Sequence, residues 1–407
     1  MTARRVLALL AAAELLGIAP WFSASAVAPA LARLWQLSPT GTAALTSSVQ
    51  LGFVAGALVS AVLTLSDRWS ARRLVAGSAA LAAVATMGVA ASRGPTAAIA
   101  WRFLTGAALA GVYPPGMKLA AGWFREARGW AIGTLVGALT LGSAAPHLVR
   151  WIVAAGAWPA VLEVAATSAL LGGLLVLRIP NDGPYAAPSP PFSWTVVPRI
   201  VRDRGVLLAN LGYLGHMWEL YAMWTWMATF VAASEAMRHG TGQGDGHAPM
   251  AGLPALVTFV VVGVGAVGSW LGGKYGDRLG RTWVTSWAMV LSGCCALTVG
   301  ILFGGALWVL MPLLLIWGVS VVADSAQFST AVSELAPQEY VGTALTLQTS
   351  LGFLLTCVTI YLLPIVSSSI GWRWSMSVLA VGPALGVWAM QTLRRRPEAA
   401  QLAGGRG

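Results

Sequence analysis

The feature that most constrains this chain is a succession of apolar stretches, each about as long as a bilayer is thick. A helix needs about 20 mainly apolar residues to cross the roughly 30 Å hydrocarbon core of a membrane. Such stretches occupy approximately residues 6–28, 41–65, 74–92, 97–120, 129–151, 156–178, 205–233, 251–273, 283–303, 306–329, 342–366 and 373–393. The chain is 57% hydrophobic and only 10% charged, which excludes an ordinary soluble surface. We therefore predict an all-α polytopic membrane protein with twelve transmembrane helices.

The first stretch has a second interpretation as a secretory signal peptide. Arg4 and Arg5 precede it, and the small residues 23–26 resemble a cleavage site. However, Glu14 interrupts the apolar region, and a proline followed by two aromatic residues is a poor approach to such a site. We expect this stretch to be retained as a helix.

The basic residues are distributed unequally between the two sets of alternating loops. Of the 25 Lys and Arg residues, 19 fall on the side that carries both termini and 6 on the other. Cytoplasmic loops of membrane proteins carry such an excess. We therefore predict a multi-pass protein of the plasma membrane (the inner membrane in a bacterium), with both termini in the cytoplasm. The net charge of +11 is then spread over many short loops, so the sequence does not predict a nucleic-acid partner.

A proline-rich interval divides the chain into two parts of similar length. Residues 179–204 contain six prolines and little that favours a helix, which is typical of a linker. Six apolar stretches lie on either side. We predict an N-terminal six-helix half over residues 1–178, a cytoplasmic linker over 179–204, and a C-terminal six-helix half with a short cytoplasmic tail over 205–407.

Local correspondences indicate that the two parts are repeats. Asp67-Arg68 follows the second stretch and Asp277-Arg278 follows the eighth, 210 residues later. In the first stretch Trp21 follows Glu14 by seven residues, and a Glu and a Trp recur with the same spacing 205 residues later. Seven residues make about two helical turns, so each acid shares a helix face with its tryptophan.

The loop after the eighth stretch resembles the loop signature of the major facilitator superfamily of secondary transporters. Residues 273–281 match its pattern Gly-x-x-x-Asp-Arg-x-Gly-Arg at every position. The copy after the second stretch departs from it, with Leu63 and Ser70 at the glycine positions and the basic pair displaced to Arg72-Arg73. The resemblance implies a fold of two pseudo-symmetric six-helix halves and transport by alternating access.

In that family the loop signature is thought to latch the two halves on the cytoplasmic side, and its charges also have a simpler role in setting topology. The candidate residues of this conformational switch are Asp67, Arg68, Gly273, Asp277, Arg278, Gly280 and Arg281. The fourth stretch also resembles the family, because Gly106 follows Arg102 by four residues, a position linked there to proton coupling. Alternatively, Arg102 extends its charge to the outer interface. Tyr113-Pro114-Pro115-Gly116 further along predicts a kink or the end of regular helix.

A few polar residues lie at membrane depth and are candidates for substrate contact or proton coupling. Carboxylates at that depth are protonated, paired or placed in a water-filled cavity. The stretches with Glu14 and Glu219 line the central cavity in the family fold, and the aromatic residues near them can stack a planar or cationic substrate, although many membrane tryptophans only form interface belts. His216 shares a helix face with Glu219 and can bond to it. The candidates are Glu14, Glu219, Asp324, Arg102, His216, Trp21, Trp226, Gln50 and Gln348.

The sequence carries no pattern typical of an enzyme, a metal site or a cofactor site. No Ser/His/Asp set, metal-ligand spacing or phosphate-binding loop can be read from it. We predict a monomeric secondary transporter that lies in the lipid bilayer and moves a small organic solute. We expect its transport to be coupled to protons, and we slightly favour export. The alternatives are a nutrient uptake symporter, a uniporter, and a non-transporting sensor or assembly protein on the same fold.

Overall fold

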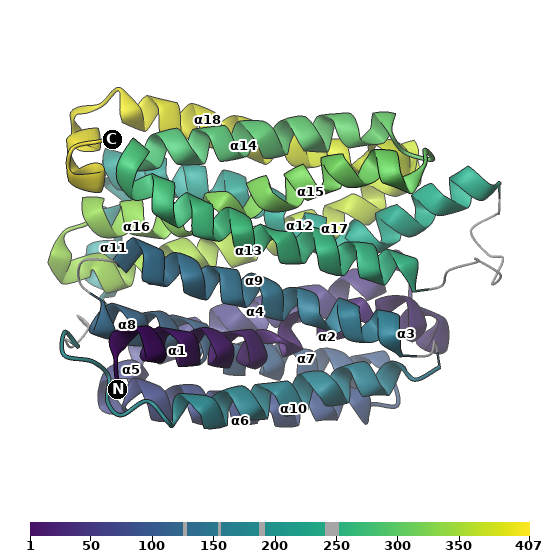
Figure 1. Ribbon diagram of the computed structural model, residues 1–407, viewed down its shortest axis with the longest axis horizontal. Helices are drawn as coiled ribbons and strands as arrows, with labels where there is room; N and C mark the ends of the chain where they lie inside the picture. Colours follow the sequence, from purple (N-terminus) through teal and green to yellow (C-terminus); the bar gives the residue numbers. More distant parts are fainter. Residues whose placement is uncertain (125–127, 154–155, 187–191, 241–251) are drawn as a thin grey trace.

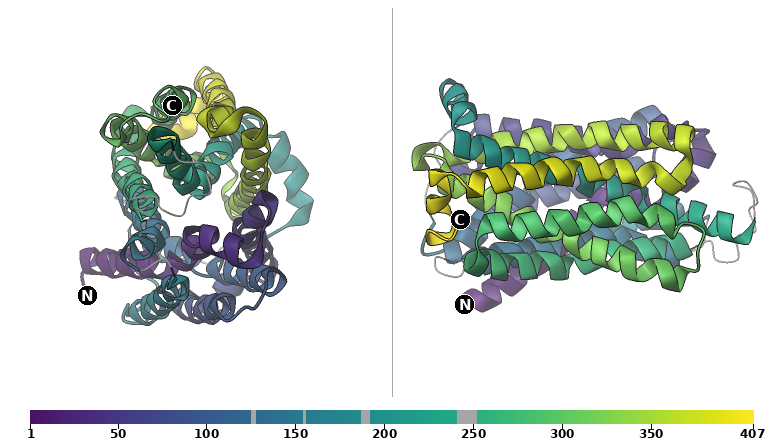
Figure 2. Two further views of the ribbon diagram at one scale, coloured as in Figure 1. Left: turned by 90° about the vertical axis from the view of Figure 1, so that its right-hand side faces the viewer. Right: turned by 90° about the horizontal axis from the view of Figure 1, so that it is seen from above.

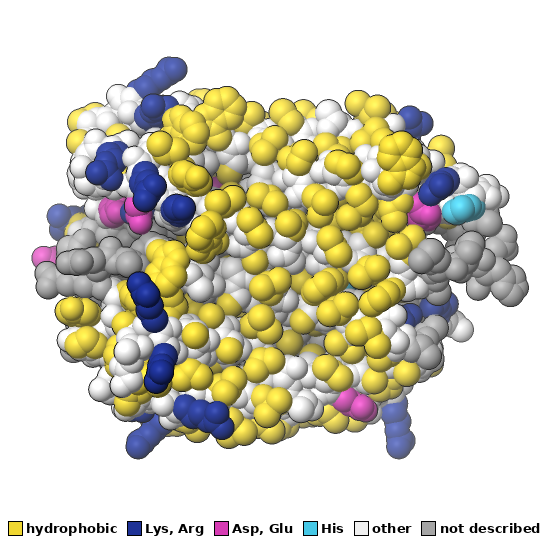
Figure 3. Space-filling view, viewed as in Figure 1, with side chains coloured by type: hydrophobic (Ala, Val, Ile, Leu, Met, Phe, Trp, Pro, Cys, Tyr) yellow, Lys and Arg dark blue, Asp and Glu magenta, His cyan; other side chains and the backbone are white. Residues whose placement is uncertain are grey.

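The computed structural model describes residues 1–124, 128–153, 156–186, 192–240 and 252–407, and over these ranges it is helical, without strands. Long helices run side by side along one direction, and both termini lie at the same end of the bundle (Figure 1). The surface in Figure 3 is mainly hydrophobic across its middle, and most of its Lys and Arg side chains gather at the end that holds the termini.

The helices up to residue 180 are α1 (Ala3–Ile18), α2 (Pro20–Ala26), α3 (Ala28–Trp35), α4 (Pro39–Val62), α5 (Leu65–Arg68), α6 (Ala71–Ala90), α7 (Pro95–Leu109), α8 (Tyr113–Trp123), α9 (Arg128–Ile152) and α10 (Trp158–Val176). Those that follow are α11 (Val197–Arg202), α12 (Arg204–His239), α13 (Leu253–Leu279), α14 (Arg281–Thr298), α15 (Leu307–Ala323), α16 (Ser325–Leu335), α17 (Val341–Ser375) and α18 (Val381–Arg394). Short 3-10 helices occupy Trp194–Val196, Val299–Ile301, Gln338–Tyr340, Met376–Ala380 and Pro397–Gly404.

Within the described ranges, nine helical stretches are long and apolar enough to cross a membrane. They are Ala3–Ala26, Pro39–Val62, Ala71–Ala90, Trp130–Ile152, Trp158–Val176, Leu253–Leu279, Arg281–Ile301, Leu307–Leu335 and Val341–Arg394. The expected stretches over 97–120 and 205–233 are not among the nine. The first is divided between α7 and α8, and the second lies in α12, which carries His216 and Glu219. The count of twelve therefore stays a prediction.

The helices before residue 180 and those after residue 204 lie on opposite sides of the molecule when it is seen end on (Figure 2). The most extensive contacts between these groups are those of α9 with α13 and of α4 with α17. Within the first group α1 packs on α9 and α10, whereas in the second α12 packs on α17 and α18. The centre of the molecule is therefore bounded by helices from both parts of the chain.

Three of the long apolar segments are interrupted partway along their length. The break between α1 and α2 falls at Pro20, and the break between α15 and α16 falls at Asp324. In the third segment α7 ends at Leu109 and α8 begins at Tyr113, which confirms the interruption predicted from the two prolines that follow Tyr113. Proline lacks the N–H that would continue the ladder. These breaks bring irregular backbone into the interior, where polar side chains can reach it.

Glycines allow α4 and α7 to approach at backbone distance. A Cβ atom added at Gly52 would collide with the carbonyl of Phe103, and one added at Gly106 would collide with the carbonyl of Val49. Helices in membranes associate through such small-residue faces, since lipid provides no hydrophobic drive between them. The same arrangement recurs between α13 and α15, where Gly268 faces the carbonyl of Val319.

We expect Gly52→Ala to lower the stability of the folded protein by about 1–3 kcal/mol, because the added methyl forces α4 away from α7. Gly77→Ala is the matched control, since Gly77 lies on the exposed face of α6 with no atom near its Cβ position. The control should be neutral or up to about 1 kcal/mol more stable, because alanine favours helix. Thermal unfolding of both purified variants in detergent checks this. Equal melting temperatures would contradict the assigned packing.

Candidate functional site

The carboxylate of Glu219 is held by side chains from two other helices. Glu219 lies on α12, and its side chain is 1% exposed. Ser292 on α14 donates its hydroxyl to Oε2 at 2.8 Å, and the indole N–H of Trp317 on α15 donates to Oε1 at 2.6 Å. Sequence reasoning missed both partners. A signal for Trp317 was available, because it lies in the middle of an apolar stretch, too deep for an interface belt.

His216 contacts Asp324, not Glu219 as the helical spacing had led us to expect. Its Nδ1 lies 2.9 Å from Oδ1 of Asp324, at ion-pair distance but without the alignment of a hydrogen bond. Asp324 occupies the junction of α15 and α16, so the break turns its side chain toward α12. The rings of Tyr213 and Phe328 lie close to His216 and exclude water from the pair. Acids and a histidine from α12 and α15–α16 thus form one cluster.

Glu14 on α1 is equally buried but differently surrounded. Its side chain is 3% exposed, and its Oε1 has no hydrogen-bond partner among the described residues. Its Oε2 faces Gly116 on α8, where an added Cβ atom would lie 2.9 Å from the carboxylate. Tyr113, at the start of α8, is near enough to interact with it electrostatically. The sequence predicted that Glu14 lies at membrane depth but could not predict that it lacks a partner.

Aromatic rings from both parts of the chain meet between α2, α4, α12 and α17. The ring of Trp21 lies 5.0 Å from that of Phe53, 5.3 Å from that of Phe353 and 5.9 Å from that of Tyr221, measured between centroids. Tyr221 and Phe353 are 5.2 Å apart. We call these four residues the aromatic cluster. The indole nitrogen of Trp21 is buried and has no hydrogen-bond partner.

Trp226, the other tryptophan predicted for the site, lies outside the aromatic cluster. Its indole N–H donates to the carbonyl of Ile360 at 3.0 Å, and its ring packs on Trp372 at 5.6 Å. Trp224 lies nearer, with its ring 5.5 Å from that of Tyr221. Of these two tryptophans of α12, Trp224 is therefore the one whose ring contacts the aromatic cluster.

Gln50 on α4 and Gln348 on α17 are fully buried, and within the described part of the chain neither amide has a hydrogen-bond partner on its oxygen or its nitrogen. Ser47 and Ser350, on the same two helices, also have buried hydroxyls without partners. More than 90% of buried polar groups in proteins are paired with protein or water. This concentration of unpaired groups where α4 meets α17 is typical of a region that binds water or a polar ligand.

Arg102 on α7 is completely buried, so the expectation that it extends to the outer interface is wrong. Its Nε donates to the carbonyl of Leu45 at 3.1 Å, its Nη1 to that of Pro20 at 2.7 Å, and its Nη2 to that of Trp21. Each contact goes to main chain at the start of α2 or on α4. Arg102 therefore fixes the position of α2, and with it the ring of Trp21.

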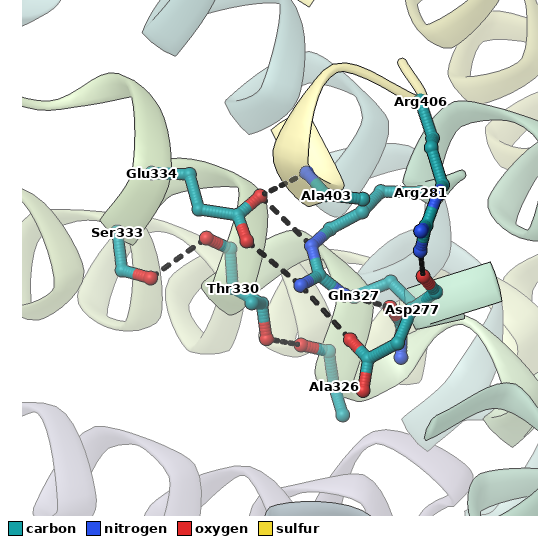
Figure 4. Close-up of polar contacts among 9 residues, drawn as sticks. All are labelled: Asp277, Arg281, Ala326, Gln327, Thr330, Ser333, Glu334, Ala403 and Arg406. Atoms are coloured by element: carbon teal, nitrogen blue, oxygen red, sulfur yellow. Dashed lines mark hydrogen bonds and ion pairs between the residues drawn. The ribbon is translucent and has the colours of Figure 1, made fainter. Parts of the chain in front are cut away.

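A second polar cluster lies at the end of the molecule that holds the termini (Figure 4). Arg281 donates from Nε and Nη2 to the two carboxylate oxygens of Glu334 at 2.9 and 2.7 Å, from Nη1 to Gln327 at 2.8 Å, and from Nη2 to Asp277 at 3.1 Å. Sequence reasoning missed Glu334 and Gln327, because both lie in an amphipathic helix end without a motif.

The C-terminal segment completes this cluster (Figure 4). The backbone N–H of Ala403 donates to Glu334 at 3.1 Å, and Arg406 donates to the carbonyl of Asp277 at 2.6 Å. The described contacts of Arg281 thus join α13, α14 and α16, and the segment after α18 closes over them. They do not reach the helices before residue 180, which is where the family resemblance had implied a latch.

The remaining residues of the two predicted loops have simpler positions. Gly280 has φ of 95°, a conformation that glycine adopts without strain, and it directly precedes α14. Gly273 lies beside α9, near Gly133. Arg278 and Arg68 are exposed. The side chain of Asp67 lies outside the described residues. In the first loop, Arg72 makes two polar contacts. Its Nε lies 3.2 Å from Asp182, and its Nη1 donates to the carbonyl of Ile179 at 2.6 Å.

Comparison with known proteins identifies the family. A sequence profile described as the Major Facilitator Superfamily matches residues 10–360. The chain belongs to the major facilitator superfamily. It is therefore a multi-pass membrane protein of a family of transporters, as the loop over 273–281 had predicted. A comparison with curated protein sequences gives no significant match.

Two solved structures share the superfamily fold with this chain. One is the proton:xylose symporter XylE bound to 6-bromo-6-deoxy-D-glucose, with 13% identity, a TM-score of 0.71, and coverage of 96% of this chain and 95% of that one. The other is a bacterial homologue of the human lysosomal transporter Spinster in an inward-facing and occupied conformation, with 13% identity, a TM-score of 0.73, and coverage of 96% and 97%. At this identity the likeness concerns the fold alone.

We expect Arg281→Met to destabilise the protein by about 2–3 kcal/mol, because it leaves the carboxylate of Glu334 without its charged partner. Arg278→Met is the matched control, since Arg278 is an exposed arginine of the same loop. Melting temperatures of the purified variants provide the measurement. A loss of the same size in both variants would mean that the loop acts only through its net charge.

Proposed function

We propose that the chain is a secondary transporter that moves a small organic solute by alternating access and couples this movement to protons. Its twelve transmembrane helices form two halves, residues 1–178 and 205–407, joined by a cytoplasmic linker over 179–204. The nine apolar stretches above supply ten of the helices, because Val341–Arg394 counts as two where its backbone leaves helical geometry at Gly371. The others are the interrupted helix α7–α8 and the polar helix α12.

Charge supports the orientation within the membrane. The end of the molecule that holds both termini carries most of the Lys and Arg side chains visible in Figure 3. Membrane proteins keep such an excess in the cytoplasm. We therefore assign this end to the cytoplasmic side of the plasma membrane, which is the inner membrane in a bacterium. We also propose that the protein acts as a monomer.

The observation that carries the proposal is the group of buried acids on helices from both halves. Glu14 lies on α1, Glu219 on α12 and Asp324 between α15 and α16, and each is almost inaccessible to solvent. Ionised side chains in a membrane interior are expensive and are kept for ion pathways and substrate sites. Three of them within one bundle, beside unpaired amides, favour a site that exchanges protons and binds a solute.

The contacts of Glu219 indicate how a proton changes the balance between two conformations. In the ionised state both of its oxygens accept hydrogen bonds, from Ser292 and Trp317. An indole N–H can only donate, whereas a hydroxyl can also accept. A proton on Glu219 is therefore accommodated on the side of Ser292, whose hydroxyl must rotate to accept it. Protonation thus changes the bonding between α12 and α14 while the bond to α15 stays.

The direction of transport has two candidates. The aromatic cluster suits apolar organic compounds, and on this ground we favour export. Uptake of a polar nutrient is the second candidate, because the unpaired amides of Gln50 and Gln348 can hydrogen-bond a neutral polar solute. Asp324 and His216 serve proton exchange in both cases.

We expect Glu219→Gln to uncouple transport from protons, because glutamine cannot gain or lose a proton. Purified protein is first screened by thermal shift against metabolites and organic cations, since a ligand of the folded state raises its stability. Flux of the best binder is then measured in proteoliposomes with and without an imposed pH gradient.

The wild type should respond to the gradient, and Glu219→Gln should keep facilitated flux but ignore it. Glu163→Gln is the matched control, because Glu163 is an exposed acid on α10. Wild-type flux that ignores the gradient would contradict proton coupling, and absence of flux for every binder would contradict transport.

A further inference from the structure

We propose that Glu14 is the anchor for the positive charge of an aromatic organic cation whose ring system packs against the aromatic cluster, and that the proton is carried separately by the acids of the C-terminal half. This inference rests on the proposed transport function and names its substrate class. It assigns different tasks to acids that sequence spacing presented as equivalent.

The first argument is the difference in bonding between the two acids. Both oxygens of Glu219 accept hydrogen bonds within the C-terminal half, and Asp324 lies beside His216. In contrast, Oε1 of Glu14 is buried without a partner. A buried carboxylate that lacks a counter-charge is unfavourable, and a bound cation supplies what is missing.

Arg102, which is also fully buried, does not fill this role. Each nitrogen of Arg102 donates to a main-chain carbonyl, to those of Leu45, Pro20 and Trp21, so its donors are directed at α2 and α4. The charge of Glu14 is therefore not matched by an arginine or lysine in a described ion pair, and it remains available to a ligand.

The second argument is that main chain borders the carboxylate. Glu14 faces Gly116 on α8, and a side chain on that residue would contact Oε2. The interruption between α7 and α8 brings this glycine opposite α1, since α8 begins only three residues before it. The carboxylate is thus flanked by main chain where a bulky side chain would otherwise cover it. Tyr113, the first residue of α8, is near enough to Glu14 to interact with it electrostatically.

The third argument is that the aromatic cluster begins on α2, the helix that directly follows the helix of Glu14. Tyr221 packs against Trp21 and Phe353, whose rings lie 5.9 and 5.2 Å from its own. Ring faces attract cations as well as planar molecules. Trp21 and Tyr221 belong to different halves. A ligand that inserts between their rings therefore replaces a contact between the two halves with contacts to the ligand.

Binding of ethidium to the purified full-length protein tests the proposal, because ethidium is a planar aromatic cation whose fluorescence reports binding. We expect saturable binding that Glu14→Gln weakens by at least about tenfold, since the charged contact is lost. Glu14→Asp should retain part of the affinity, and Glu219→Gln should leave it within about threefold. Tetraethylammonium, which has the charge without rings, should compete poorly, and 1-naphthalenesulfonate, which has rings with the opposite charge, should not compete.

Size-exclusion profiles and melting temperatures establish that each variant is folded. The proposal is overturned if ethidium shows no saturable binding, if folded Glu14→Gln binds it as the wild type does, or if Glu219→Gln loses as much affinity as Glu14→Gln. The outcome is separable from that of the proposed function. Ethidium binding through Glu14 without proton-coupled flux supports this site and contradicts coupling, whereas coupled flux of another solute without ethidium binding does the reverse.

Discussion

The architecture depends on the hydrogen bonding of the main chain in a medium without water. In hydrocarbon, each unpaired N–H or C=O costs several kcal/mol, so a chain of this composition can cross only as helices. Interruptions are tolerated where protein groups satisfy the freed main chain. The side chain of Arg102 does this at the break between α1 and α2, where it donates to the carbonyls of Pro20 and Trp21. The polar centre is therefore built around the places where helices are broken.

The sequence was most informative where depth alone decides the outcome. Glu14, Glu219 and Asp324 lie at membrane depth by sequence, and all three are buried. Their partners were not predictable, because the rotation of each helix and the direction of each break determine which side chains meet. In the sequence, Ser292 is not distinguished from other small residues of membrane helices, because only the orientation of α14 places its side chain against α12. Likewise, the contact of His216 with Asp324 depends on a break in another helix.

The two parts of the chain repeat their packing but not their chemistry. Glycines bring α4 to α7 and α13 to α15 in the same way, through carbonyls of the facing helix. The acids at the corresponding positions of α1 and α12 differ. Both carboxylate oxygens of Glu219 accept a hydrogen bond, whereas Oε1 of Glu14 has no partner among the described residues. Two repeats that share their helix packing but differ in the hydrogen bonds of one side chain can give equivalent positions different functions.

Arg72 and Arg281 also occupy comparable places near the start of a helix. Each is linked to the segment that follows the last long helix of its part of the chain, Arg72 directly and Arg281 through Glu334. Arg72 holds Ile179 and Asp182 after α10, whereas Arg281 lies with Glu334 beneath Ala403 after α18. The beginning of the connector between the two parts is thus folded back as the C-terminal segment is. Each part of the chain therefore closes with a short segment that is tied to the start of one of its own helices, α6 in the first part and α14 in the second.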